Sequence, residues 1–294
     1  MQRNAQTQQL ERYRDYARRA CELINVREVP PLPEVALKVL EYADDAVIST
    51  EEISSVIIRD QGLTSQILKM ANSAFFGLKR QIATIRHAAV VLGTKRLRSM
   101  VITASMSRVY SRSALGRIFW EHALVVALIS SELAKIHRIS DPEMAFVAGI
   151  MHDIGKSILA AQYPEDYRVV NDKIQTERIS SCKAEQKQFG TDHSHVGAFV
   201  ADTWYLPQPL HDAIQYHHAT WRAEHEPELT SIIYLADRIA HSIGVGPVKN
   251  PKLDFREIAR EVEVEVDPDI LAAVGDGIRA RYEKERQAFG LPSA

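Results

Sequence analysis

Residues 119–137 read FWEHALVVALISSELAKIH, and this long apolar stretch decides the fold class. Val126, Ile129 and Leu133 follow His122 at helical spacing, which predicts an amphipathic helix with His122 on its buried stripe. The same periodicity recurs on both sides of this stretch, and strands do not alternate with helices. The sequence therefore predicts an all-α protein.

The first half of the chain is predicted to form short helices separated by helix-breaking residues. A run of prolines within residues 30–33 ends the first helix, which spans residues 7–26. Residues 111–116 are small, polar and basic and lie between two strongly periodic segments, so we expect a boundary there. The chain is thus predicted to form two packed helical lobes, residues 1–111 and residues 112–294.

The composition indicates an ordinary globular protein of 294 residues, 46% of them apolar and 25% charged. The net charge of −2 disfavours a dedicated nucleic-acid-binding protein, which usually carries a strongly basic face. Cys21 and Cys182 form no CxxC motif, so they indicate thiols in a reducing compartment. A charged N-terminus and the lack of about 18 consecutive apolar residues disfavour a signal peptide and a membrane span. We therefore expect a cytoplasmic protein without membrane or nucleic-acid partners.

The strongest sequence motif for chemistry is MHDIGK at residues 151–156. His152 and Asp153 are adjacent at a predicted helix end, where both can point at one ion, and Gly155 is expected to allow a sharp bend of the backbone after them. Asp237 lies within the apolar stripe of a helix over residues 229–243, which points a carboxylate at the core. An unpaired buried carboxylate costs several kcal/mol, so a cation or strong hydrogen bonds must compensate. Together with His122, these residues form a candidate metal site.

Three further histidines are candidates for a second ion. His193, His217 and His218 lie on or at the ends of predicted helices, and Asp153 would bridge the two sites. Two metals about 3.5–4 Å apart would activate a bridging water for attack on a phosphoester. Asp153 and Lys156 are the candidate catalytic residues, with Lys156 neutralising phosphate charge. Imidazole and carboxylate ligands suit one or two divalent ions of Fe, Mn, Zn, Ni or Mg.

Each candidate has a simpler structural interpretation when it is taken alone. His152 and Asp153 could hydrogen-bond a helix end, and Asp237 could pair with an arginine or cap a helix. The convergence of several imidazoles and acids at inward positions favours a metal centre over unrelated polar groups. The remaining histidines are expected to be ordinary surface residues: His87, His137, His195, His211, His225 and His241.

The order His122, His152–Asp153, Asp237 resembles the H…HD…D signature of the HD superfamily of metal-dependent phosphohydrolases. A more specific resemblance, to the HDOD family, covers roughly residues 20–240. It is carried by PPLP at 30–33, LKMANSAFFGL at 68–78, IRHAAVVLG at 85–93, WEH at 120–122 and FGTDH at 189–193. The resemblance implies a helical N-terminal lobe packed on an HD-like bundle, with a role in bacterial signal transduction through a protein partner.

The resemblance also leaves the activity open. HDOD proteins are generally regarded as non-catalytic outputs that have lost HD ligands, whereas the ligands are intact in this chain. His193, His217, His218 and Lys156 match positions of the related HD-GYP phosphodiesterases, but residues 219–221 read ATW and no GYP motif follows. The favoured hypothesis is a metal-binding signalling module that binds a partner protein, a nucleotide or a phosphoester. The alternatives are a metal-dependent phosphohydrolase and a vestigial HD fold without metal.

Overall fold

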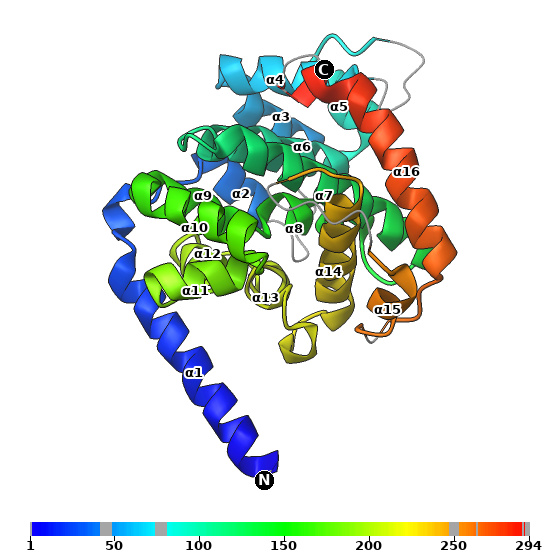
Figure 1. The fold of residues 1–294 in the computed structure, drawn as a ribbon. Helices are drawn as coiled ribbons and strands as arrows, with labels where there is room; N and C mark the ends of the chain where they lie inside the picture. Colours follow the sequence, from blue (N-terminus) through cyan, green and yellow to red (C-terminus); the bar gives the residue numbers. More distant parts are fainter. Residues whose placement is uncertain are drawn as a thin grey trace.

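The computed structural model describes residues 2–41, 49–73, 81–246, 253–262, 264–289 and 291. These residues form helices and connecting loops with no strand among them (Figure 1), which confirms the all-α prediction. Residues 74–78 of the motif at 68–78 lie outside the described residues.

Local signals explain where the helices of the first half begin and end. Ser49 and Glu52 form a capping box in which each side chain accepts a hydrogen bond from the other residue's backbone N–H. Thr84 caps the helix Ile85–Leu92, and Gly93 ends this helix at a φ of 84°, a conformation that favours glycine. The helices are α1 (Gln2–Leu23), α2 (Glu34–Glu41), α3 (Thr50–Ile58), α4 (Gln61–Ala71), α5 (Ile85–Leu92) and α6 (Thr94–Tyr110).

The second half of the chain is built from ten further α-helices in the described residues. They are α7 (Gly116–His137), α8 (Pro142–Met151), α9 (Ile154–Gln162), α10 (Pro164–Glu177), α11 (Ser181–Phe189), α12 (His193–Thr203), α13 (Gln208–Tyr216), α14 (Pro227–Ser242), α15 (Phe255–Ala259) and α16 (Pro268–Glu285). Short 3₁₀ helices lie at Val26–Glu28, Thr220–Arg222 and Arg286–Phe289.

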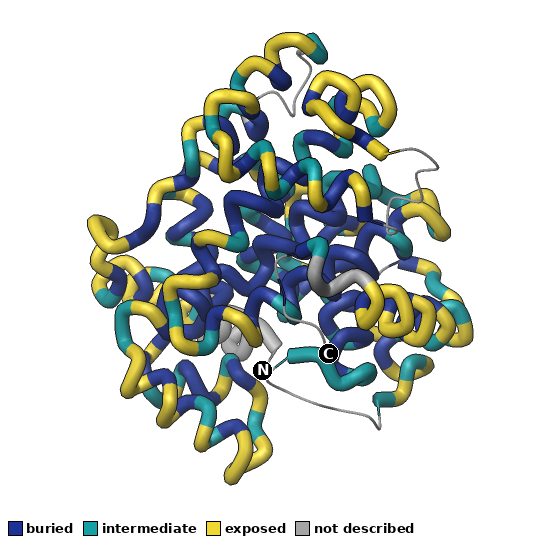
Figure 2. The backbone as a smooth tube through the Cα atoms, turned by 90° about the horizontal axis from the view of Figure 1, so that it is seen from above, coloured by how far each residue is buried: buried dark blue, intermediate teal, exposed yellow. Residues whose placement is uncertain are grey.

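Helix α7 is the central element of the fold, and α8, α14 and α16 pack around it. The backbones of α7 and α8 approach closely, since a Cβ added to Gly149 would lie 2.5 Å from the Cα of Ala127. The buried residues gather along this interior (Figure 2). The packing places the N-terminal turns of α7 beside the C-terminal end of α8, where the candidate site residues lie.

Contacts cross the predicted lobe boundary from both ends of the chain. Thr191 Oγ1 donates a hydrogen bond of 2.8 Å to the carbonyl of Tyr16, which holds α1 against the start of α12. Near the other end of the chain, the 3₁₀ helix Arg286–Phe289 packs against α4. The N-terminal end of α1 extends away from the rest of the protein (Figure 1). The division near residue 111 stays a prediction.

One stretch of the described residues, Pro142–Gln162, has the length and apolar composition of a membrane span. It comprises α8 and α9, and 89% of its most apolar window is buried inside the fold. Such burial is typical of core helices in soluble proteins.

Candidate metal centre

The MHDIGK motif forms the junction between α8 and α9. His152 is the C-cap of α8 and Asp153 the N-cap of α9, and both side chains are buried. We expected a backbone bend at Gly155, but Gly155 lies within α9, where it allows close helix packing. A Cβ there would lie 2.0 Å from the carbonyl oxygen of His193. This contact brings the start of α12 against the motif, and with it His193.

The Asp153 carboxylate lies at the middle of the cluster, with its two oxygens facing different groups. Oδ2 is 3.4 Å from Nε2 of His152, 3.5 Å from Nε2 of His122 and 2.6 Å from Nζ of Lys156. Oδ1 is 3.3 Å from Nε2 of His193 and 3.6 Å from Nε2 of His217. The structure therefore brings together donors from α7, α8, α12 and the end of α13 around one carboxylate.

Hydrogen bonds on the far side of three rings orient them toward Asp153. Nδ1 of His152 donates to the carbonyl of Gly149 at 2.8 Å, and Nδ1 of His217 donates to that of Ile214 at 2.8 Å. Nδ1 of His122 contacts the carbonyl of Val245 at 3.2 Å. A carbonyl oxygen can only accept, so each Nδ1 carries the hydrogen. In its neutral form, a ring held this way presents the Nε2 lone pair to the centre, as metal-binding histidines do.

His193 is held in the same way by a carboxylate that the sequence analysis missed. Oε2 of Glu185, on α11, accepts hydrogen bonds from Nδ1 of His193 at 2.6 Å and from its backbone N–H at 2.9 Å. Oε1 of Glu185 accepts from the hydroxyl of Tyr167 at 2.7 Å. Glu185 is fully buried. Its helix reads SCKAEQKQF, whose polar composition gives no indication that a glutamate is buried there.

Asp237 lies on the buried face of α14, as its position in the apolar stripe predicted. Its Oδ1 is 2.9 Å from Nε2 of His122 and 3.6 Å from Nε2 of His241. His241 was expected at the surface, and this expectation is wrong, since the residue is buried. Its ring stacks on that of His122 with centroids 4.9 Å apart. The helical spacing of four residues between Asp237 and His241 could have identified it.

His218 and His195 differ in how they relate to the cluster. Nε2 of His218 is 3.0 Å from Nε2 of His193, so His218 extends the cluster toward the surface. His195 was also expected at the surface but is buried, because α1 covers it with the rings of Tyr13 and Tyr16. It bonds Asp192 rather than the cluster. Of the other histidines, His87 and His225 are exposed as expected, and His137 and His211 are half-buried.

The two central acids are ionised at neutral pH. Burial raises the pKa of Asp153, but the charges of His152 and Lys156 outweigh it and hold that pKa well below its usual value. Burial also raises the pKa of Asp237, and neighbouring histidines outweigh it in the same way. Both acids are therefore available as anionic ligands.

Three imidazoles near these acids, those of His217, His218 and His241, have a lowered pKa. Burial lowers the pKa of His217, and burial with the neighbouring rings holds that of His218 well below its usual value. Burial lowers the pKa of His241 to about 4 despite the opposing charge of Asp237. His152 differs, because Asp153 raises its pKa by more than burial lowers it.

The cluster is chemically suited to a cation. Asp153, Asp237 and Glu185 are three buried carboxylates and Lys156 is a buried ammonium group, which together leave two negative charges. Asp153 Oδ1 and His152 Nε2 are buried without a hydrogen-bond partner among the described residues. Buried charge and buried polar atoms without hydrogen-bond partners cost several kcal/mol unless a counter-ion or protons compensate. These buried His/Asp clusters are able to bind metal.

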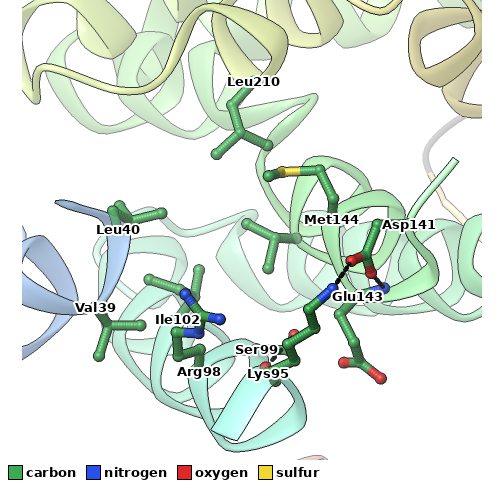
Figure 3. Close-up of a pocket in the computed structure, with 11 residues that line it drawn as sticks. Val39, Leu40, Lys95, Arg98, Ser99, Ile102, Asp141, Glu143, Met144 and Leu210 are labelled. Carbon is green, nitrogen blue, oxygen red and sulfur yellow. Dashed lines mark hydrogen bonds and ion pairs between the residues drawn. The ribbon is translucent and has the colours of Figure 1, made fainter. Parts of the chain in front are cut away.

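One hollow in the structure borders this centre, and a second lies away from it. One, of about 730 Å³ and partly open to solvent, includes His218 of the cluster; it is lined by His218, Thr220, Trp221, Tyr234 and Glu261. The other lies between α2, α6, α8 and α13 and includes none of the cluster (Figure 3). Apolar side chains such as Leu40, Ile102 and Met144 line it, and the Lys95–Asp141 ion pair of 2.6 Å lies at one side.

Comparisons with known proteins fit this fold. The HDOD domain family matches residues 29–220. An uncharacterised protein of Treponema pallidum (strain Nichols) is 25% identical over 274 residues, 90% of this chain and 51% of that protein. This chain thus spans about half the length of that relative.

Solved structures show the same arrangement of helices. An HDOD domain protein of unknown function from Geobacter sulfurreducens matches with a TM-score of 0.79 and 24% identity, over 91% of this chain and 97% of that one. A protein from Shewanella amazonensis SB2B, provisionally assigned as a phosphohydrolase, matches with a TM-score of 0.70 and 23% identity, over 90% and 95%. At these identities the likeness shows the fold alone.

Proposed function

The chain belongs to the HDOD domain family, and on this premise we propose that it is a metal-holding module of bacterial signal transduction. In this proposal one or two divalent ions occupy the His/Asp centre, and the module acts in the cytoplasm by binding a partner protein or a small phosphorylated ligand. Since the chain spans about half of a longer relative, the partner can be a separate protein or another part of a longer chain.

The observation that carries the proposal is the position of Asp153 between two sets of imidazole nitrogens. Its Oδ2 faces Nε2 of His122 and His152, and its Oδ1 faces Nε2 of His193 and His217. The proposed ligands are His122, His152, Asp153 and Asp237 for one ion, and Asp153, His193, His217 and His218 for the other. Full burial of most of these side chains favours ions that are held permanently and stabilise the fold.

One observation favours the enzymatic alternative, a metal-dependent phosphohydrolase. The hollow beside His218 lets a ligand approach this end of the centre from solvent. Divalent ions would supply Lewis-acid chemistry that polarises a phosphoester and lowers the pKa of water. Lys156 pairs with Asp153 at 2.6 Å, so it would act first by orienting Asp153. The ligand's phosphate would have to draw this ammonium group away before Lys156 could neutralise it.

The metal proposal is tested by elemental analysis of protein purified without chelator. We expect at least one divalent ion per chain, a melting temperature that falls on chelation, and loss of most metal in Asp153→Asn. The control is His225→Gln, which alters an exposed histidine and should leave metal content unchanged. A stoichiometry near zero would support the vestigial fold instead.

A second assay separates the module from the enzyme. The metal-loaded protein is incubated with generic and cyclic-nucleotide phosphoesters. Turnover that Asp153→Ala abolishes, while the variant stays folded, would favour the phosphohydrolase. Metal binding without turnover on any phosphoester supports the signalling module.

A further inference from the structure

Cys182 is a thiol next to the histidines at the outer end of the centre. We propose that the Cys182 thiolate is a ligand of the ion held by His193 and His218, so that this end of the centre prefers Zn²⁺ to Mg²⁺ or Mn²⁺. This inference rests on the proposed function, because it requires that the centre holds metal. It assigns a ligand and a metal class that the His/Asp pattern alone does not give.

The geometry brings three donor atoms within reach of one ion. The ligand atoms of Cys182, His193 and His218 all lie within 4.8 Å of one another, and the two Nε2 atoms are 3.0 Å apart. In a tetrahedral zinc site, bond lengths of about 2.0–2.3 Å place nitrogen pairs roughly 3.3 Å apart and sulfur roughly 3.5 Å from nitrogen. The imidazoles already have this spacing, and the thiol needs to move by little more than about 1 Å.

The positions on α11 explain why the thiol points toward this histidine. Cys182 and Glu185 are three residues apart, so they lie on the same face of the helix. Glu185 bonds Nδ1 of His193 at 2.6 Å, which leaves Nε2 of that ring directed at His218. Cys182 is free of any disulfide and has no hydrogen-bond partner among the described residues. The carboxylate orients the histidine, and the thiol is available as a ligand.

The donor set indicates which metal this end would take. A thiolate beside the proposed imidazole and carboxylate ligands gives the mixed sulfur, nitrogen and oxygen donor set that zinc accepts in proteins. Asp153 Oδ1 and His217 Nε2, two of those proposed ligands, are each 3.3 Å from Nε2 of His193. Mg²⁺ and Mn²⁺ prefer oxygen ligands, whereas thiolates bind Zn²⁺ and Co²⁺ well.

Cobalt spectroscopy tests the inference on the whole chain. Protein loaded with Co²⁺ should show a thiolate-to-cobalt charge-transfer band in the near ultraviolet, and Cys182→Ser should lose the band. The matched control is Cys21→Ser, which removes the exposed cysteine of α1 and should keep the band. Cys182→Ser should also weaken Zn²⁺ binding by about 10-fold or more, relative to the control.

The outcomes separate this inference from the proposed function. Cobalt bound without the band, or a band that persists in Cys182→Ser, would overturn the thiolate ligand and leave the metal module intact. A chain that binds no cobalt or zinc would overturn both. If Cys182→Ser fails to fold, X-ray absorption of the unaltered zinc protein decides, with a sulfur neighbour at about 2.3 Å supporting the inference. A shell of nitrogen and oxygen alone would contradict it.

Discussion

Replacing Glu185 by glutamine should weaken metal binding at the centre and destabilise the fold, although it substitutes none of the proposed metal ligands. Glu185 is fully buried and accepts three hydrogen bonds, two from His193 and one from Tyr167. Glutamine has nearly the same size, so no cavity forms. It removes the negative charge and replaces one acceptor oxygen by an NH₂ group, which cannot accept.

The magnitude follows from these contacts. A hydrogen bond to a charged group contributes about 1.5–3 kcal/mol, and the neutral amide keeps only part of that. We expect Glu185→Gln to lower the free energy of unfolding by about 2–3 kcal/mol, dominated by the loss at His193. For a chain of this size the melting temperature should fall by roughly 3–5 °C. Metal affinity should fall by about 10–100-fold, because the His193 ring is less firmly oriented and less basic.

Urea unfolding and a competitive metal-chelator titration measure these two effects. The matched control is Glu165→Gln, which changes a glutamate whose side chain is 80% exposed and paired with Arg168. A surface pair of this kind is worth about 0–1 kcal/mol, so stability and metal affinity should hardly change. If Glu185→Gln behaves like the control in both measurements, the reasoning about an orienting carboxylate is wrong.

Three further substitutions test other parts of the structure. Asp237→Ala should lower both metal content and melting temperature, whereas an unchanged melting curve would argue against Asp237 as a ligand. Gly155→Ala should cost about 3 kcal/mol or more in urea unfolding, because its Cβ would lie 2.0 Å from the His193 carbonyl; wild-type stability would refute this close contact. Burial raises the pKa of Asp192, but His195 outweighs it, so the pKa lies well below its usual value. This ionised carboxylate stabilises the fold above the unfolded-state pKa of about 4, and its contribution is lost as the pH falls. Urea unfolding should therefore find Asp192→Asn less stable than wild type at neutral pH, with a difference that shrinks toward about pH 3; a constant difference would contradict the shift.

Helical periodicity predicted the inward-facing candidates well. His122 and Asp237 each lie on a helix face whose apolar residues recur every three or four positions, and both side chains are buried in the structure. The sequence also predicted that His152 and Asp153 lie side by side at a helix end, because they are adjacent in the motif. The seven candidate ligands do lie together, while their roles in binding metal stay predictions.

The sequence could not predict residues whose burial depends on distant segments. Glu185 lies on a polar helix and is buried because α10 and α12 pack over it. His195 is buried because α1 packs against α12, a contact between residues far apart in sequence. His241 differs from these two residues, because its position four residues after Asp237 on α14 could have predicted its burial. Gly155 was interpreted as a bend because close packing against His193 leaves no local sequence pattern.

The central claim is that ions lie on either side of the Asp153 carboxylate. Anomalous X-ray diffraction from crystals of protein purified without chelator tests it most directly, because the signal locates each metal and identifies its element. We expect a peak between Asp153, His122 and His152, and a second between Asp153, His193 and His217 when both sites are filled. Crystals without anomalous density near Asp153, even after soaking in Zn²⁺ or Mn²⁺, would contradict it.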